Sequence, residues 1–179
     1  NGWFVETEAT ALATRPVARQ VYGPNAGRDA IDRMGAGAKG AGVTTTADLV
    51  WGMADGFEPE WNDHASAIAE GTFPLRIFMI PFEPKLVREF GSDMLHFLET
   101  KRAEGSARLN THGVKYVNDG SYPSMTLVMN EPGYLDEDGA HTGEVPWEDM
   151  VDRMLPFWKA GIQIHSHANG DRTLDMTLD

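Results

Sequence analysis

Two histidines in this sequence have side chains that bind metals and a spacing that would place them together. His165 and His167 lie near the carboxyl end of an apolar segment, residues 162–167. If that segment is a strand, residues two apart share a face, so both imidazoles point the same way. Neutral imidazole is a common ligand for zinc and similar ions. The alternative is a pair of hydrogen-bonded structural histidines, and the residue pattern alone favours neither.

A lysine adds to this chemistry from a second strand-like segment, residues 113–119. Lys115 alternates there with Val117 and Asp119, among residues that are otherwise apolar. An amine on the inside of a sheet or barrel is costly unless it is paired or chemically modified. Such a lysine can form a Schiff base, act as a base, or ligate a metal once carbamylated. The alternative is a lysine that reaches solvent at the end of a strand.

Other features of the sequence are weaker candidates for a functional site. Residues 35–40 match the pattern G-x-G-x-x-G. A dinucleotide-binding site needs a strand before that pattern and a helix after it, and here the predicted order is reversed. We interpret the run as a flexible helix end. The remaining histidines are expected to be surface or structural residues: His64, His96, His112 and His141.

Apolar patterning predicts strands that alternate with helices. The predicted strands are residues 43–49, 75–81, 113–119 and 162–167, and the predicted helices are residues 25–34, 61–70, 84–102 and 146–160. This alternation predicts an α/β fold with a parallel sheet and crossover helices. Residues 120–145 are predicted to be a long loop, which is usually functional or mobile. We interpret one face of the last helix as core packing: Trp147, Met150, Val151, Met154, Leu155 and Trp158.

Composition excludes several classes of function. The chain has 179 residues, which suits one domain, with 15 basic and 27 acidic side chains and a formal net charge of −12. That charge argues against binding nucleic acid, and no apolar run reaches the ~18 residues that span a bilayer. The absence of cysteine excludes disulfides, a cysteine nucleophile and thiolate metal sites. The first residues lack an initiator methionine and a signal peptide, so we expect the chain to be cut from a longer protein.

Five short motifs together resemble one known family. They are residues 42–45, 75–76, 113–121, 131–134 and 165–172. In this order and spacing they resemble the amidohydrolase superfamily, and within it amidohydrolase family 3, the group of N-substituted formamide deformylase-like hydrolases. The resemblance implies a (β/α)8 barrel of which this chain holds about strands two to five. It divides the chain into an N-terminal segment, 1–35, and a partial barrel domain, 36–179.

The same resemblance implies a metal centre and a reaction. Lys115 matches the lysine of the fourth strand, which in many members is carbamylated and bridges two metals. His167 matches the histidine ligand of the fifth strand, with His165 as its neighbour, and Asp171 lies in a structural Gly-Asp turn. The implied cofactor is a divalent metal, with zinc expected. The implied reaction is attack of a metal-activated water on an amide or related C–N bond of a small-molecule substrate.

The chain lacks parts that the family requires. The first-strand His-x-His pair, the sixth-strand histidine and the general-base aspartate of the eighth strand would all lie outside it, and a complete barrel needs about 250 residues. We therefore expect the chain by itself to be inactive. Its open sheet edges predict either a homo-oligomer or a truncated chain. Two alternatives remain: a non-catalytic regulatory or interaction domain on the same scaffold, and an aldolase-like barrel in which Lys115 forms a Schiff base.

Overall fold

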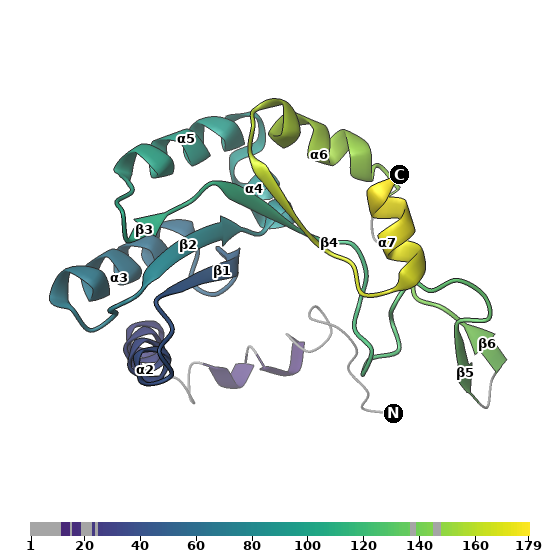
Figure 1. Cartoon of the computed structure of the whole chain (residues 1–179), viewed down its shortest axis with the longest axis horizontal. Coiled ribbons are helices and arrows are strands. Elements are labelled where there is room, and N and C mark those ends of the chain that lie inside the picture. Colours follow the sequence, from purple (N-terminus) through teal and green to yellow (C-terminus); the bar gives the residue numbers. More distant parts are fainter. Residues whose placement is uncertain (1–11, 15, 19–22, 24, 137–138, 145–147) are drawn as a thin grey trace. The chain divides into compact units, whose positions relative to one another are not determined.

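Helices and strands alternate along the chain in the computed structural model. The structure describes residues 12–14, 16–18, 23, 25–136, 139–144 and 148–179. The elements are α2 (Ala26–Gly40), β1 (Thr45–Trp51), α3 (Phe57–Glu70), β2 (Arg76–Pro81), α4 (Glu83–Phe90), η1 (Gly91–Asp93), α5 (Met94–Glu104), β3 (Leu109–Asn110), β4 (Gly113–Val117), β5 (Tyr134–Asp136), β6 (Gly139–His141), α6 (Met150–Lys159), β7 (Gln163–His167) and α7 (Asp171–Leu178) (Figure 1). No helix among these residues is both long and apolar enough to cross a membrane.

The chain divides into two compact units. The larger contains Tyr22–Tyr116 and Met154–His165, and the smaller contains Val117–Arg153 and Ser166–Asp179. The division falls within β4, α6 and β7. The larger unit therefore holds the first three strands and the beginnings of β4 and β7, and the smaller unit holds the ends of those two strands.

A parallel sheet forms the centre of the larger unit. Its strand order is β1-β2-β3, with Thr45 opposite Arg76 and Ile77 opposite Leu109. Just beyond the end of β2, Phe82 forms a parallel bridge with Lys115. β3 therefore pairs with the first part of β2, and β4 lies beside the residue that follows β2. The mixed α/β fold with parallel strands that the sequence predicts is confirmed.

β4 pairs with β7 in a two-stranded sheet. At the start of both strands the Gln163 N–H donates to the His112 carbonyl over 3.1 Å. At the end of both strands the Asn118 N–H donates to the His167 carbonyl over 3.0 Å. Since residue numbers rise together along the pair, these two strands are also parallel.

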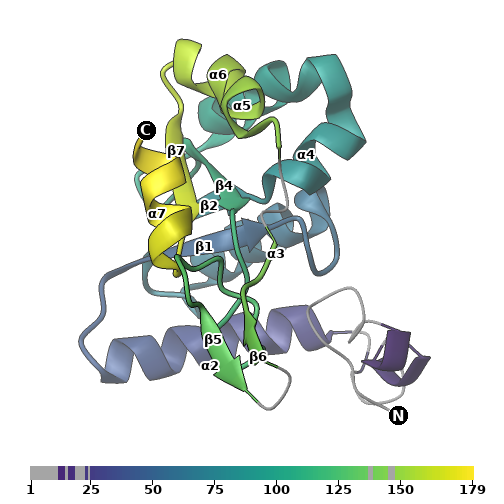
Figure 2. The same ribbon diagram turned by 90° about the vertical axis from the view of Figure 1, so that its right-hand side faces the viewer.

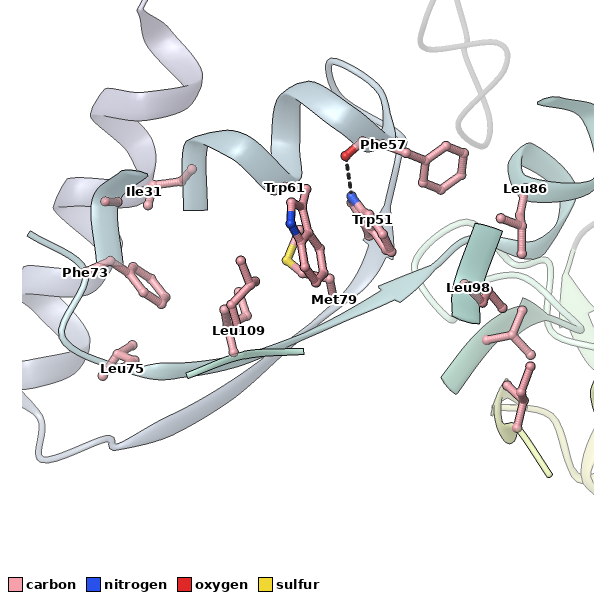
Figure 3. Close-up of a cluster of buried hydrophobic side chains, with 14 of the residues drawn as sticks. Ile31, Trp51, Phe57, Trp61, Phe73, Leu75, Met79, Leu86, Leu98 and Leu109 are labelled. Carbon is pink, nitrogen blue, oxygen red and sulfur yellow. Dashed lines mark hydrogen bonds between the residues drawn. The ribbon is translucent and has the colours of Figure 1, made fainter. Parts of the chain in front are cut away.

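Aromatic and aliphatic side chains fill the space between the sheet and its helices in the larger unit (Figure 3). Ile77 and Met79 point from β2 into this core, where Trp51 is fully buried. The Trp51 indole N–H donates to the Phe57 carbonyl over 2.9 Å, and the Trp51 and Phe57 rings meet edge to face at 5.3 Å. This bond satisfies the one polar atom of the indole, as a buried tryptophan requires.

The glycine-rich run after residue 34 is helical, contrary to the predicted helix end. α2 continues to Gly40, and one of its glycines, Gly35, lets it approach the segment before β2. At Gly35, a Cβ would lie 2.9 Å from the Thr72 carbonyl oxygen and 3.1 Å from the Phe73 Cα. Close packing of the helix therefore outweighs the poor helix propensity of glycine.

Three other elements differ from their predicted forms. The helix expected over residues 84–102 is divided into α4, η1 and α5, because Gly91 has a φ of +53° that a continuing helix does not allow. The loop expected over residues 120–145 contains the antiparallel hairpin β5–β6 (Figure 2). α3 begins at Phe57 and not at residue 61.

α6 buries a narrower stripe than its sequence predicts. Met150 and Phe157 are buried, but Val151 and Trp158 are 72% and 70% exposed. Residues 150, 154 and 157 follow helical spacing along one side, and residues 151 and 158 lie seven apart on another. The interpretation of Val151 and Trp158 as core residues is therefore wrong, and Trp147 lies outside the described residues.

Two glycines of α2 offer a matched test of this packing. We expect Gly35→Ala to lower the free energy of unfolding by about 1–3 kcal/mol, because the new methyl group would push against the backbone of Thr72 and Phe73. Gly37 has nothing within 4 Å of its Cβ position, so Gly37→Ala should raise stability by about 0.5–1 kcal/mol. Urea unfolding followed by circular dichroism measures both values. Equal effects of the two substitutions would contradict the packing.

Candidate metal centre

Alternation along β4 determines where Lys115 points. Val114 and Tyr116 are fully buried in the core, where the Tyr116 ring lies 6.4 Å from that of Phe157. Gly113 and Lys115 therefore lie on the opposite face of the strand. Ile162 and Ile164 likewise join the core from β7, which leaves His165 on the face away from it.

Lys115 is a buried residue whose amine has no partner among the described residues. The residue is 8% exposed, and the amine has no hydrogen bond or ion pair in the part of the chain that the structure describes. Burial lowers the pKa of the Lys115 amine below its usual value, because desolvation disfavours the charged form.

A second buried lysine in the same unit shows the usual way to compensate such a charge. Lys101 lies 2.7 Å from a Glu58 carboxylate oxygen and 2.8 Å from a Glu104 carboxylate oxygen. Burial works to lower the pKa of Lys101, but its hydrogen bonds to Glu104 and Glu58 outweigh burial and raise it. Lys115 has no such compensation, which sets it apart as a candidate for chemistry.

His165 occupies space that a glycine leaves open. A Cβ on Gly113 would lie 2.7 Å from the His165 Nε2, so only glycine fits beneath the ring. That nitrogen is buried and has no hydrogen-bond partner among the described residues. Desolvation lowers the pKa of His165, and the positive charges of Lys115 and His112 lower it further.

His112 was not expected to take part in this site. It is exposed, and its ring meets that of Phe78 at 4.5 Å, but it lies near enough to His165 to lower the pKa of that imidazole. The only sequence feature that could have indicated this role is the position of His112, one residue before β4. The larger unit thus brings Lys115, His165 and His112 together as three basic side chains.

His167 lies in the smaller unit, where two groups contact one nitrogen of its ring. Its Nε2 is 2.9 Å from the Gly120 carbonyl oxygen and 2.8 Å from the side-chain amide nitrogen of Asn169. Whether Nε2 donates to the carbonyl or accepts from the amide depends on the tautomer of the ring. These contacts orient an imidazole, which is a common metal ligand.

A buried carboxylate stabilises the turn that follows His167. Asp119 is 3% exposed, and its oxygens accept hydrogen bonds from the Asn169 N–H at 3.1 Å, the Gly170 N–H at 2.6 Å and the Thr173 hydroxyl at 2.9 Å. The acidic side chain thereby joins the end of β4 to the first turn of α7. Its negative charge also suits a helix N-terminus.

The Gly-Asp pair at the start of α7 anchors the segment that follows β4. A Cβ on Gly170 would collide with the Val128 carbonyl oxygen, so the helix can approach this closely only with glycine. Asp171 accepts hydrogen bonds from the Asn130 backbone N–H at 2.9 Å and its side-chain amide at 3.2 Å. The Asn130 N–H is the main cause that holds the pKa of the Asp171 carboxyl below its usual range. This is the structural role expected for Asp171.

The donor groups fit a metal, although they do not form a complete site within either unit. No group of three histidine, aspartate or glutamate side chains in the described part of the chain could hold an ion. Lys115 and His165 belong to the larger unit and His167 to the smaller one. Each supplies an uncommitted nitrogen, which suits an imidazole-preferring ion such as zinc. The convergence of Lys115 and His167 stays a prediction.

A cavity of about 500 Å³ lies elsewhere in the larger unit, lined by α2, β1 and α3. Asp48 and Thr46 line it, and they pair with Met79 and Ile77, whose side chains face the helices. Phe82 lies three residues after Met79 and therefore on the opposite face of the sheet. Lys115, which bridges to Phe82, lies on that opposite face as well. The cavity is therefore separate from the candidate metal centre.

The sequence matches a family model, the amidohydrolase family, over residues 4–179. The chain belongs to the amidohydrolase family. A comparison with curated proteins finds no match.

Two solved structures resemble this member of the amidohydrolase family. Both are described as uncharacterized metal-dependent hydrolases, one from Pyrococcus horikoshii OT3 and one from Pyrococcus furiosus. Each is 21% identical, with TM-scores of 0.72 and 0.71, and each match covers 97% of this chain. The likeness shows a shared fold. The chain spans 34% of the length of either protein.

The buried carboxylate at position 119 can be tested in this amidohydrolase-family chain. We expect Asp119→Asn to lower the free energy of unfolding by about 2–3 kcal/mol, because it removes a buried charge that accepts several hydrogen bonds. Asp171→Asn is the control, and it should cost less than about 1 kcal/mol because Asp171 is exposed. Urea unfolding measures stability. A loss at Asp119 no larger than at Asp171 would refute the assignment.

Proposed function

We propose that this chain is the central part of a metal-dependent amidohydrolase-family enzyme, built as a partial (β/α)8 barrel. In this arrangement β1, β2, the β3–β4 pair and β7 are the second to fifth barrel strands. The parallel strand order and the covered fraction of the two solved hydrolases support this assignment. The remaining strands and ligands would come from the rest of a longer protein.

Lys115, His167 and His165 are the proposed metal-binding residues, with zinc as the favoured ion. When bound, a divalent metal lowers the pKa of water and polarises the scissile carbonyl. In the protein, the Gly120 carbonyl and the Asn169 side-chain amide contact the His167 Nε2 and orient the ring that would hold the ion. Gly113 makes room for the ring of His165.

The observation that carries the proposal is Lys115, a buried residue whose amine has no hydrogen bond or ion pair in the described part of the chain. With its pKa lowered by burial, this amine is more often neutral and nucleophilic than a surface lysine. A neutral amine adds CO2, forming an N–C bond and releasing a proton, and the carbamate that results carries two oxygen ligands. Carbamylation would also supply the negative charge that this environment lacks.

The proposed substrate is a small molecule with an amide or related C–N bond. Family membership supports a hydrolase. The acidic balance of the chain disfavours anionic substrates at long range. The specific reaction, including action on N-substituted formamides, is part of the proposal.

The same buried amine favours a second candidate, a Schiff-base lysine. A lysine with a lowered pKa attacks carbonyl carbon, and borohydride then traps the imine as a stable adduct. Trapping at Lys115 with a ketone or aldehyde would support this candidate. The two histidines, His165 and His167, favour the metal centre, since Schiff-base chemistry requires neither.

Metal content tests the proposal in the full-length protein. We expect about one or two divalent ions per chain in the purified protein, and we expect Lys115→Ala to lose them together with amide hydrolysis, because it removes the proposed bridging ligand. Lys39→Ala, which changes an exposed lysine of α2, should keep both. Elemental analysis measures the metal, and mass spectrometry of the intact chain detects one added CO2.

Two results would refute the metal centre. One is a full-length protein that hydrolyses an amide without bound metal. The other is a Lys115→Ala variant that keeps its full metal content and loses no CO2 adduct. Activity lost with metal content unchanged would point to the Schiff-base candidate.

A further inference from the structure

Side chains of two kinds line the cavity of about 500 Å³ beside α2, β1 and α3. Its larger apolar side chains come from α2 and the sheet: Ile31, Met34, Leu49 and Ile77. Its acidic side chains come from β1, α3 and the loop between them: Asp48, Asp55, Glu60 and Asp63. Among the residues that the structure describes, no lysine or arginine lines this cavity. A ligand there would meet an apolar surface and an excess of negative charge.

Two of the carboxylates lie close together beside Gly27. The point where a Cβ on Gly27 would lie is 3.2 Å from the Asp55 Oδ2 and 3.5 Å from the Asp63 Oδ2. Neither side chain has a hydrogen bond or ion pair within the described ranges of the chain. Both oxygens are therefore within reach of one small group, at a place that glycine leaves open. Like charges so near each other repel, and a cation between them would relieve that repulsion.

The other two carboxylates have structural roles. The Glu60 side chain accepts hydrogen bonds from the backbone N–H groups of residues 52, 54, 55 and 56, at 2.8–3.0 Å. The Asp48 carboxylate accepts one from the Val50 N–H at 2.9 Å. Glu60 thereby fixes the backbone of the loop that carries Asp55. A site whose loop is already held loses less entropy when a ligand binds.

His64 adds a buried acceptor to the lining of the cavity. The residue is 5% exposed, and its Nδ1 is 2.8 Å from the Glu60 carbonyl oxygen. Because a carbonyl only accepts, Nδ1 donates, and the Nε2 of the neutral ring keeps a lone pair. That Nε2 is buried and has no hydrogen-bond partner among the described residues. A buried acceptor without a partner is costly, so a donor from a ligand would stabilise this site.

The free groups of the cavity suit an ammonium ion better than a metal. In the described part of the chain, no group of three histidine, aspartate or glutamate side chains could hold a metal ion. The groups without partners at this cavity, the carboxylates of Asp55 and Asp63 and the His64 Nε2, are all acceptors. An ammonium group carries a positive charge and three N–H donors, and it has no acceptor.

We propose that this cavity binds a small organic ammonium ion. The ammonium group lies at Asp55 and Asp63, and the hydrocarbon part of the ligand packs against the apolar side chains of α2 and the sheet. The volume suits a small molecule, since such sites measure roughly 300–1,000 Å³. The site is separate from Lys115 and its histidines, so this inference does not depend on the proposed function.

Calorimetric titration of the full-length protein at pH 7 tests the charge of the ligand. The probes share one chain length: hexylammonium, hexanol and hexanoate. We expect hexylammonium to bind about tenfold or more tightly than hexanol, because hydrogen bonds to a charged group are the stronger ones, and hexanoate to bind more weakly than either. Asp63→Asn should weaken hexylammonium binding about tenfold. Asp29→Asn, the same charge change at an exposed residue of α2 outside the cavity, should leave it unchanged.

Two glycine variants test the position of the ammonium group. Gly27→Ala would place a methyl group beside the two free carboxylates, and it should weaken hexylammonium binding about tenfold or more by occupying that space. Gly37→Ala adds a methyl group to the same helix with nothing within 4 Å, so it should leave binding unchanged. Alanine favours a helix over glycine, so weaker binding would not reflect a poorer helix. Thermal unfolding checks that each variant is folded.

Three results would overturn the ammonium site. They are equal affinities for hexylammonium and hexanol, hexylammonium binding that is unchanged in both Asp63→Asn and Gly27→Ala, and binding that is lost when a chelator removes metal from the protein. The last result would place the amine at the metal centre. A full-length protein that holds no metal but binds hexylammonium through Asp63 would refute the proposed function and support this inference.

Discussion

A strand that packs one face against helices must present its other face away from them. This constraint determines which side chains of β4 are available for chemistry. Val114 and Tyr116 fill the core, so Lys115 lies on the opposite face of the strand. Lys101, on α5, pairs with two helix carboxylates. The two lysines are similarly buried, but among the described residues Lys115 has no opposite charge paired with it.

A second constraint acts where the strands end. Parallel strands bring their carboxyl ends to one edge, where the chain must turn without leaving backbone groups unpaired. In the smaller unit, the Asp119 carboxylate accepts hydrogen bonds from the N–H groups of Asn169 and Gly170. These bonds join the residues just after β4 to those just after β7. The Gly120 carbonyl contacts the ring of His167 in the same region.

Much of this arrangement could be predicted from sequence because it depends on alternation. The strands around residues 75–81, 113–119 and 162–167 have apolar side chains at regular intervals, and the structure has strands there. The faces of Lys115 and His165 follow from the same rule. The family resemblance rested on these motifs, and the family match confirms the amidohydrolase family, while the N-substituted formamide deformylase-like group stays a prediction.

Other features depend on contacts between distant segments, which one sequence does not display. Gly35 of α2 is explained by Thr72 and Phe73, which lie more than thirty positions away. The hairpin β5–β6 has strands of three residues each, too short for a periodic pattern to show. The nearness of His112 to His165 likewise requires the pairing of β4 with β7.

The electrostatics around Lys115 bear on the choice between the two proposed chemistries. Lys115 and His165 are desolvated basic groups whose pKa values are lowered, so their surroundings favour neutral nitrogens or an added anion. A carbamate on Lys115 would supply that anion. A Schiff base on Lys115 would add no negative charge.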